Sequence, residues 1–426
     1  MQSVRSQEVD DSWSFKDLSR LQTSYITHDY HRYPAKFIPQ LASRIIKENS
    51  DVGDLVCDPF MGSGTTLVEA IVSGRRAYGT DINPVSVLIS KAKTTPIEPL
   101  FLQQQSSSLL AKIKSGIANR YGQMLLVTDN YDIKIPNNKR LDYWFPEKQK
   151  NDLATILSII NTIDDDRMRI FSLCAFSNIL KGCSNWMMKS VKPTRDKRKI
   201  IADAYKSYVF QIRKMVVKNG HFWNMLAGKD ISCVVDNSDA RKMNINNDSA
   251  LLILTSPPYV TSYEYADLHQ LTAIWLGYAD SLSDFRSKFI GSIQKDIRPL
   301  KLYSKTGKEI ADKLRSIDKR EADGVEQYFF EMQECFEETN RVLIHGGKAA
   351  IVIGDTDLKK VKIQNANVFV ETMENIGFKT DKIIRRPIPS KILPLTRDEK
   401  TGRFASTSMA NRLAYPIENI LIMEKI

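Results

Sequence analysis

Short apolar runs that stop at polar or turn-forming residues recur along this chain. One run covers residues 55–57, another residues 77–79, and a third, fully aliphatic, residues 251–254. Runs of this length that end at a breaker are typical of strands buried in a parallel sheet. Similar patterns predict strands at residues 231–235 and 348–353, and a closing hairpin from residues 379–386 and 418–424. The fold class expected is α/β, a mostly parallel sheet with a C-terminal antiparallel hairpin.

The first predicted strand leads into a glycine turn and then a helix. Gly62 and Gly64 form the turn, and apolar positions after Thr65 have helical spacing. Glycines here allow a ligand to approach backbone amides at the start of the helix. Asp81 ends the next strand, roughly twenty residues further on, where a carboxylate can reach a ribose diol. No Lys-Ser or Lys-Thr follows the glycines, so the pattern favours an adenosine-containing cofactor over a P-loop.

The aliphatic run at residues 251–254 ends in Thr255-Ser256-Pro257-Pro258-Tyr259. Two prolines cannot continue a sheet ladder, so the chain is expected to leave the sheet there in a stiff, extended turn. The turn would bring a hydroxyl, a carbonyl oxygen and an aromatic ring to the carboxyl end of a strand. These groups suit a flat base with an exocyclic amine. Taken alone, the stretch fits a plain strand and proline turn equally well.

Residues 97–229 are expected to be mainly helical, because apolar residues recur there at helix spacing. The recurrences are Leu153, Ile156, Leu157 and Ile160, then Ile170, Leu173, Phe176 and Leu180. A second insertion, polar and rich in lysine, spans about residues 278–325. The predicted organisation is therefore one core in two parts, residues 1–96 and 230–426, separated by the helical insertion at residues 97–229.

Composition narrows the class of protein. The chain has 426 residues, of which 42% are hydrophobic, enough for a large α/β domain and a second body. It has no apolar stretch of membrane-spanning length and no apolar core of a signal peptide, so we expect a cytoplasmic protein without membrane association. The five cysteines form no Cys-x-x-Cys pair or Cys/His cluster, so no metal site is expected.

The motifs, in their order along the chain, resemble those of the S-adenosylmethionine-dependent amino-methyltransferases of DNA. Asp58 to Gly64 looks like the family's cofactor motif, and Asp81 like its ribose acid. Residues 255–259 match the catalytic tetrapeptide in its Ser-Pro-Pro-Tyr form. Residues 31–39 are similar to the N-terminal motif that lies over the methionine end of the cofactor, and Asp239-Ala240-Arg241 to the motif that contacts adenine.

This resemblance covers about residues 28–95 and 230–426. It implies a Rossmann-like class I methyltransferase fold, S-adenosylmethionine as the cofactor and double-stranded DNA as the partner. The catalytic residues that it implies are Ser256, Pro257, Pro258 and Tyr259. The cofactor-binding residues that it implies are Tyr33, Pro34, Phe37, Asp58, Phe60, Gly62, Gly64, Thr65, Asp81, Asp239, Ala240 and Thr255.

In the family, Ser at the first tetrapeptide position accompanies methylation of cytosine N4, and Asp or Asn usually accompanies adenine N6. The amine's lone pair is delocalised into the ring, and hydrogen bonds to Ser256 and the Pro257 carbonyl would concentrate it on nitrogen for direct displacement. Methylation at cytosine carbon 5 instead needs a thiolate added to the ring, typically from a Pro-Cys pair. None of the five cysteines follows a proline, which argues against that reaction. A base in duplex DNA must be flipped out, with Tyr259 stacking on it.

The formal net charge of +11 and the sequence pI near 9.2 suit a polyanionic partner. Residues 181–229 hold twelve Lys and Arg against two Asp, almost the whole excess. A charge run is often only a solvated face, but this one lies in an insertion between the two motifs. We therefore expect DNA phosphates to contact Lys192, Arg195, Lys197, Arg198 and Lys199.

Two other functions stay open on the sequence alone. One is a methyltransferase that acts on adenine N6 of DNA, or on an amine of RNA, although no RNA-binding module is recognisable. The other is a DNA-binding protein that keeps the fold and has lost catalysis, which intact motif residues disfavour. The sequence leaves open the recognition site, a cognate restriction endonuclease as a further partner, and the oligomeric state.

Overall fold

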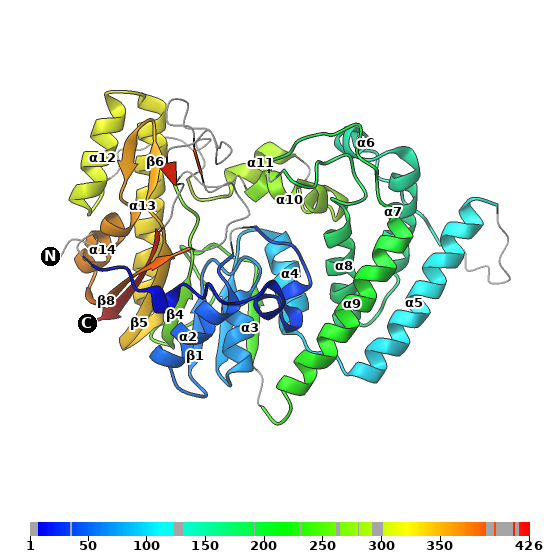
Figure 1. Cartoon of the computed structure of the whole chain (residues 1–426), viewed down its shortest axis with the longest axis horizontal. Helices are drawn as coiled ribbons and strands as arrows, with labels where there is room; N and C mark the ends of the chain where they lie inside the picture. The colour runs from blue at the N-terminus through cyan, green and yellow to red at the C-terminus, as the bar shows by residue number, and fades with distance from the viewer. Residues whose placement is uncertain are drawn as a thin grey trace.

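The computed structural model describes residues 7–34, 36–122, 131–190, 192–229, 232–260, 265–279, 281–291, 301–388, 396–397, 412–413 and 417–426. Its centre is a twisted sheet with strand order β3-β2-β1-β4-β5-β11-β8 (Figure 1). The strands are β1 (Leu55–Asp58), β2 (Arg76–Thr80), β3 (Cys233–Asp236), β4 (Ala250–Thr255), β5 (Leu343–Ile353), β8 (Phe378–Pro387) and β11 (Ile417–Lys425). Short pairs are formed by β6 (Thr356–Leu358) with β7 (Val361–Ile363) and by β9 (Thr396–Arg397) with β10 (Arg412–Leu413).

The pairing confirms the predicted fold class. Strands β3, β2, β1, β4 and β5 run parallel, whereas β11 is antiparallel to both β5 and β8. A parallel sheet of this order closed by an antiparallel hairpin is the Rossmann-like arrangement that the resemblance implied. The predicted strand at residues 231–235 is found as β3, although residue 231 lies outside the described residues.

Alternate residues of the central strands enter two different cores, as the period of two in a strand requires. Val56 and Leu252 face α2 (Pro39–Asn49) and α3 (Thr65–Val72). Cys57 and Ile253 face α13 (Lys319–Val342) and α14 (Asn365–Asn375). The sheet is therefore covered on both faces, which explains why its strands read as continuous apolar runs.

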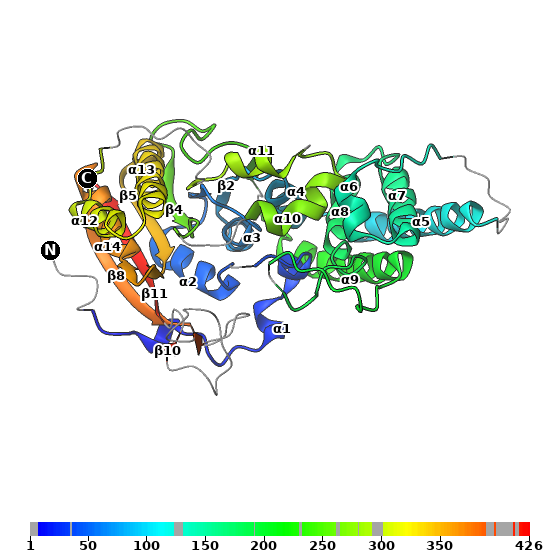
Figure 2. The ribbon, with the colours of Figure 1, turned by 90° about the horizontal axis from the view of Figure 1, so that it is seen from above.

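A helical body lies beside the sheet, on the side opposite α12–α14 in both ribbon views (Figure 1, Figure 2). It packs around one apolar core together with α4 and α10, so α4 serves both sheet and body. Its helices are α5 (Pro99–Arg120), α6 (Lys139–Trp144), α7 (Glu147–Ile160), α8 (Asp166–Ile179) and α9 (Ala204–Met225). The remaining helices are η2 (Asp11–Trp13), α1 (Arg20–Thr23), η3 (Ile26–Asp29), α4 (Pro84–Thr94), α10 (Tyr265–Trp275), α11 (Leu282–Ser287) and α12 (Lys305–Arg315).

Several predicted boundaries differ from the structure. The helix before β5 begins at Lys319, inside the insertion expected at about residues 278–325, because Ala322 and Val325 are already buried against the sheet core. Of the predicted face at α8, Phe176 and Leu180 are buried as expected, whereas Ile170 and Leu173 are only half-buried. Met168, Phe171 and Ala175 are fully buried instead, so the buried surface of α8 is wider than the predicted face. Lys295 and Arg298, two basic residues of the insertion expected at about residues 278–325, lie outside the described residues.

Within the described ranges, no helix is long and apolar enough to cross a bilayer. The same residues hold no group of three or more His, Cys, Asp or Glu side chains arranged to bind a metal ion.

Candidate active site

A cleft opens at the carboxyl ends of the central parallel strands, where open α/β sheets bind ligands. It is lined by residues from three distant parts of the chain. Those predicted from the sequence are Tyr33, Phe37, Asp58, Phe60, Gly62, Thr65, Asp81, Asp239, Ala240, Ser256 and Pro258. The structure therefore brings the predicted cofactor motif and part of the predicted catalytic turn to one cavity.

The glycine turn has the tight geometry that its sequence predicts. Gly62 has a φ of +48°, and a side chain there would lie 3.3 Å from the ring of Tyr33. Gly64 has a φ of +71° and precedes α3, and a Cβ there would approach the Ser90 Oγ to 2.9 Å. Both positions thus combine a left-handed backbone with a close neighbour, so larger residues would deform the turn beside the cleft.

Asp81 lies at the rim of this turn. Its carboxylate accepts hydrogen bonds from the backbone N–H groups of Gly62 (3.0 Å) and Asn83 (2.9 Å). Burial raises the pKa of the Asp81 carboxyl to about 6. The side chain still faces the cleft, so the carboxylate is oriented by the backbone and can accept further hydrogen bonds from a ligand's hydroxyl groups.

Asp58 joins the two motifs. The Thr255 hydroxyl donates to the Asp58 carboxylate at 2.6 Å, and the Phe60 N–H donates to the same oxygen at 3.0 Å. Burial raises the pKa of the Asp58 carboxyl to about 6. Thr255 itself does not line the cleft. Its predicted role in cofactor binding is therefore better described as holding Asp58 in place.

The turn after β4 leaves the sheet as expected, but its residues point in different directions. Ser256 and Pro258 line the cleft, whereas Pro257 and Tyr259 do not. The Tyr259 hydroxyl donates to Glu418 at 2.9 Å. Its predicted stacking on a base stays a prediction. Two predicted cofactor residues, Pro34 and Gly64, also lie outside the lining.

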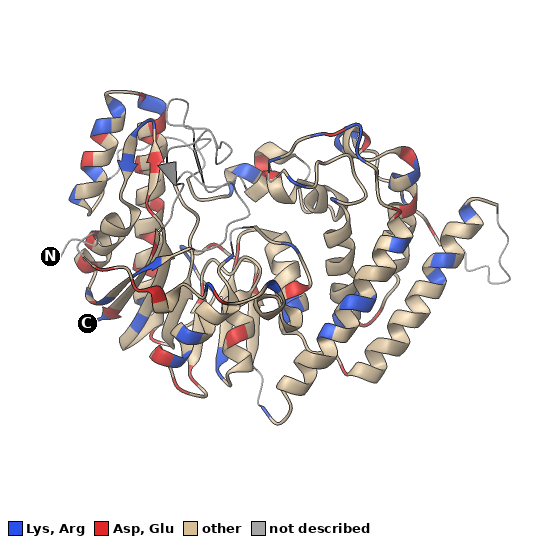
Figure 3. Ribbon diagram, viewed as in Figure 1, with Lys and Arg blue, Asp and Glu red and all other residues tan. Residues whose placement is uncertain are grey.

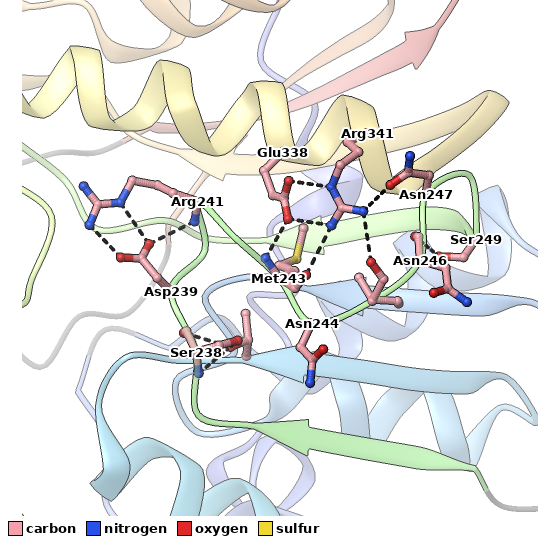
Figure 4. A network of polar contacts seen from close by, with 12 residues as sticks. Ser238, Asp239, Arg241, Met243, Asn244, Asn246, Asn247, Ser249, Glu338 and Arg341 are labelled. Carbon is pink, nitrogen blue, oxygen red and sulfur yellow. Dashed lines mark hydrogen bonds and ion pairs between the residues drawn. The ribbon is translucent and has the colours of Figure 1, made fainter.

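The segment after β3 carries the predicted adenine-contacting residues. Asp239 and Arg241 form a bidentate ion pair, with an Nη2–Oδ2 distance of 2.6 Å, beside the cleft (Figure 4). Further along, Arg341 of α13 pairs with Glu338 and donates to the carbonyl of Met243, which fastens the segment to the helix. Asp239 and Ala240 are thereby presented to the cavity by a fixed loop.

Several lining residues were not singled out from the sequence. Lys36 lies within the N-terminal motif, and burial lowers the pKa of its ammonium to about 8. Tyr265 stacks on Tyr33, with ring centroids 6.2 Å apart. Lys288 and Phe289 come from the segment after α11. Lysine and aromatic residues at these places carry no motif, so only the folded chain identifies them as part of the cleft.

The residues present fit a cofactor with adenosine and amino-acid ends. Asp81 offers acceptors for ribose hydroxyls, and Phe37 and Phe60 offer apolar surface. Ser63 and Thr65 also line the cleft, and their buried hydroxyls have no hydrogen-bond partner among the described residues. Such buried polar groups need partners, which a polar ligand end in the cleft would supply.

The basic segment at residues 192–199 is a folded loop held against α6. The Lys199 ammonium donates to the carbonyls of Lys181 (2.6 Å), Ser184 (2.7 Å) and Trp186 (2.9 Å), and burial lowers its pKa to about 8. The Arg195 guanidinium lies 4.4 Å above the ring of Tyr143. We no longer expect Lys199 to meet phosphate, because its three donors are used inside the loop.

Lys192, Lys197 and Arg198 are exposed on this loop and stay candidates for phosphate contact, as does the half-buried Arg195. Further Lys and Arg positions follow along α9 (Figure 3). Two of these have internal partners, since Lys214 and Lys218 donate to the carbonyls of Asp29 and Ser24 in the N-terminal segment. The sequence count of charges therefore overstates the number that are free to bind DNA.

Comparison with known proteins agrees with the site. Residues 1–92 match the model of the DNA methylase family. Type II methyltransferase M.MvaI of Kocuria varians is 28% identical over 98% of this chain and 96% of its own length. These matches support the resemblance to the S-adenosylmethionine-dependent DNA amino-methyltransferases. Type II methyltransferase M.BsoBI of Geobacillus stearothermophilus is 22% identical over 84% of this chain and 79% of its own. M.MjaII of Methanocaldococcus jannaschii is 37% identical over 25% of this chain and 20% of its own.

Proposed function

We propose that this protein methylates the N4 amine of cytosine at a specific site in duplex DNA, with the target cytosine flipped out of the helix. The observation that carries the proposal is Ser256, which lines the same cleft as Asp81 and the glycine turn. A hydroxyl rather than an acid or amide stands at the first position of the tetrapeptide. In the resemblance described above, this form accompanies cytosine N4.

S-adenosylmethionine bound in the cleft supplies the methyl group. The chain's own groups orient the amine: the Ser256 hydroxyl and the Pro257 carbonyl accept its hydrogens, which increases electron density on nitrogen. Neither group has a hydrogen-bond partner among the described residues. Acceptors fixed on a rigid proline turn lower the barrier by alignment rather than by covalent chemistry.

No protein nucleophile takes part in this scheme. Cys57, the cysteine nearest the cleft motifs, is fully buried, and burial raises the pKa of its thiol above the ordinary value. Methylation at cytosine carbon 5 requires a thiolate that adds to the ring, and formation of a thiolate at Cys57 is therefore disfavoured.

We further propose that the helical body, residues 97–229, takes part in target recognition, with Lys192, Lys197 and Arg198 contacting phosphates. The relatives with the longest matches are Type II methyltransferases. We therefore place the protein in a Type II system, in which a cognate restriction endonuclease would recognise the same site.

The deciding experiment is to express the chain in cells that lack DNA methylation and to sequence their DNA with detection of modified bases. We expect N4-methylcytosine at one position of one short sequence, absent from cells that express Ser256→Ala. N6-methyladenine at a defined site would overturn the choice of base and keep the family. Modified RNA with unmodified DNA would overturn the proposed substrate.

A further inference from the structure

The Tyr259 side chain makes contacts with β11 and with the residue that follows β5 that its motif does not predict. Its ring lies against Gly354, just after β5, where a Cβ on the glycine would approach Tyr259 Cε2 to 3.2 Å. Its hydroxyl donates to Glu418 Oε1 at 2.9 Å. Burial and the adjacent carboxylate raise the pKa of Tyr259 well above its ordinary value, so the ring keeps its proton and stays a donor.

Glu418 is itself fixed by a second buried group. It stands directly opposite Arg386 in the antiparallel pair of β11 and β8. Arg386 Nε donates to Glu418 Oε2 at 3.0 Å, and the two residues are only 4% and 8% exposed. Arg386 Nη1 also donates to the carbonyl of Trp13 at 2.9 Å. Each carboxylate oxygen thus has its own donor, one from Arg386 and one from Tyr259.

The rest of the turn is anchored on its other side. The Tyr328 hydroxyl of α13 donates to the Pro258 carbonyl at 2.7 Å, and Thr255 donates to Asp58. These bonds engage the Pro258 carbonyl and the Thr255 hydroxyl, which belong to the residues on either side of Ser256 and Pro257. They leave the two groups that the proposed chemistry needs, the Ser256 hydroxyl and the Pro257 carbonyl, without competing partners among the described residues.

A buried ion pair is a costly way to fill space, since apolar side chains of similar volume are often as stable or more so. A phenylalanine at residue 259 would pack against Gly354 without any carboxylate beneath it. The directional chain Arg386–Glu418–Tyr259 instead fixes the orientation of the tyrosine ring and, through it, the proline turn.

We propose that Glu418, held by Arg386, is a positioning residue that sets Tyr259 and the turn at residues 256–259 for methyl transfer. This inference rests on the proposed function of the turn. It predicts that the Tyr259–Glu418 hydrogen bond contributes to the rate of the chemical step and not to cofactor binding. It concerns residues on β8 and β11, outside every motif that the sequence resembles.

The test is a double-mutant cycle with Tyr259→Phe, Glu418→Gln and the double variant. Single-turnover methylation should slow by roughly ten- to a hundredfold in each single variant, the range for a lost hydrogen bond to a charged group. The double variant should be slowed no more than the worse single variant, because both remove one interaction. The dissociation constant for S-adenosylmethionine should stay near the wild-type value in all three.

Glu424→Gln is the matched control. Glu424 lies on the same strand and pairs with Lys379 opposite it at 3.0 Å, at the other end of the hairpin. It should leave the methylation rate unchanged. Fluorescence of 2-aminopurine at the target position should show wild-type flipping with Glu424→Gln and altered stacking of the flipped base with Tyr259→Phe.

Independent, multiplying losses in the cycle would overturn the inference, as would wild-type rates in both single variants. A lower melting temperature with an unchanged rate would make the chain Arg386–Glu418–Tyr259 purely structural. If the wild-type enzyme methylates adenine instead of cytosine, the proposed base is wrong, while the cycle still measures positioning on adenine.

Discussion

We expect cofactor binding at Asp58 and Asp81 to be sensitive to mild acid. Burial raises the pKa of both carboxyls to about 6, so they are ionised at neutral pH and become protonated as the pH falls through 6. Ribose hydroxyls donate best to an ionised carboxylate. We expect the affinity for S-adenosylmethionine to be level above pH 7 and to fall below pH 6, measured by calorimetry.

Asp81→Asn is the control for this titration. It should weaken binding at neutral pH by roughly ten- to a hundredfold, the range for a charged hydrogen bond, and flatten the part of the pH dependence due to Asp81. The stability of the folded state depends on pH in a different way from the affinity. Because both pKa values are raised on folding, these two groups make the folded state more stable as the pH falls from about 6 toward 4, the opposite direction to the loss of affinity. An affinity independent of pH in the wild type would contradict the assignment of Asp81.

Ser256 separates chemistry from binding. Ser256→Ala removes the hydroxyl that is proposed to accept a hydrogen from the amine, and it leaves Asp81 and the glycine turn unchanged. Single-turnover methylation should fall by at least about tenfold, since a hydrogen bond realised in the transition state is lost. Cofactor affinity should stay within about twofold of the wild type. A wild-type rate would show that the Pro257 carbonyl alone orients the amine, or that the turn does not touch the base.

The sequence predicts the positions of motif residues when those positions depend only on the local backbone. Gly62, Gly64 and Asp81 follow from a strand, a turn and the next strand, and all three are found where that order requires. Tyr259 and Lys199 were not predictable in the same way, because each is held by a partner far along the chain or across a loop. No spacing rule connects Tyr259 with Glu418, 159 residues away, or shows that Lys199 turns inward.

The glycine turn before α3 offers a test of backbone and contact together. Gly64→Ala places a side chain at a φ of +71° and within 3.3 Å of the Ser90 Cα. The left-handed backbone alone costs about 1 kcal/mol or more for a non-glycine residue, and the contact adds to it. We expect a drop in the free energy of unfolding of about 2 kcal/mol or more in urea denaturation, together with weaker cofactor binding.

Gly228→Ala is the matched variant, with a φ of +72° and no neighbour within 4 Å. It should show the backbone cost alone and normal cofactor binding. Equal destabilisation by the two substitutions would mean that the contact with Ser90 relaxes and that only the backbone matters.

Strands were predicted more accurately than the edges of helices. A strand in a doubly covered sheet is apolar along its whole length, so β1, β2 and β4 stand out in the sequence. The face of a helix depends on what packs against it. In α8 the neighbours are α4, α7 and α9, which together bury more than one stripe and blur the period. The start of α13 was hidden in a similar way, since its first turn holds Lys319, Arg320 and Glu321 and buries only Ala322.

The two halves of the predicted core meet although the helical body separates them in the sequence. β1 pairs with both β2 and β4, so the cofactor motif and the turn after β4 share one sheet edge whatever the length of the insertion. The insertion can therefore change its surface without disturbing the cleft. The contribution of its exposed charges to DNA binding should be separable from catalysis.

Salt dependence measures that contribution. If Lys192, Lys197 and Arg198 each meet a phosphate, replacing all three with Ala should lower the log–log salt slope of DNA binding by about three units, with affinity falling alike for specific and unrelated duplexes. The methylated sequence should not change, because phosphate contacts carry no base information. Lys199→Ala should instead lower the free energy of unfolding, since the carbonyls of Lys181, Ser184 and Trp186 lose the ammonium that they share.

A triple Ala variant of Lys305, Lys308 and Lys313 on α12 removes the same charge from the opposite side of the molecule in Figure 3. If the loop at residues 192–199 faces the DNA, this variant should leave the salt slope near the wild-type value, which excludes net charge as the cause of the loop's effect. The reverse outcome, a reduced slope with the α12 variant alone, would place the duplex across α12. A changed methylation sequence with an unchanged slope would place the loop in a groove of the DNA, where its side chains read bases.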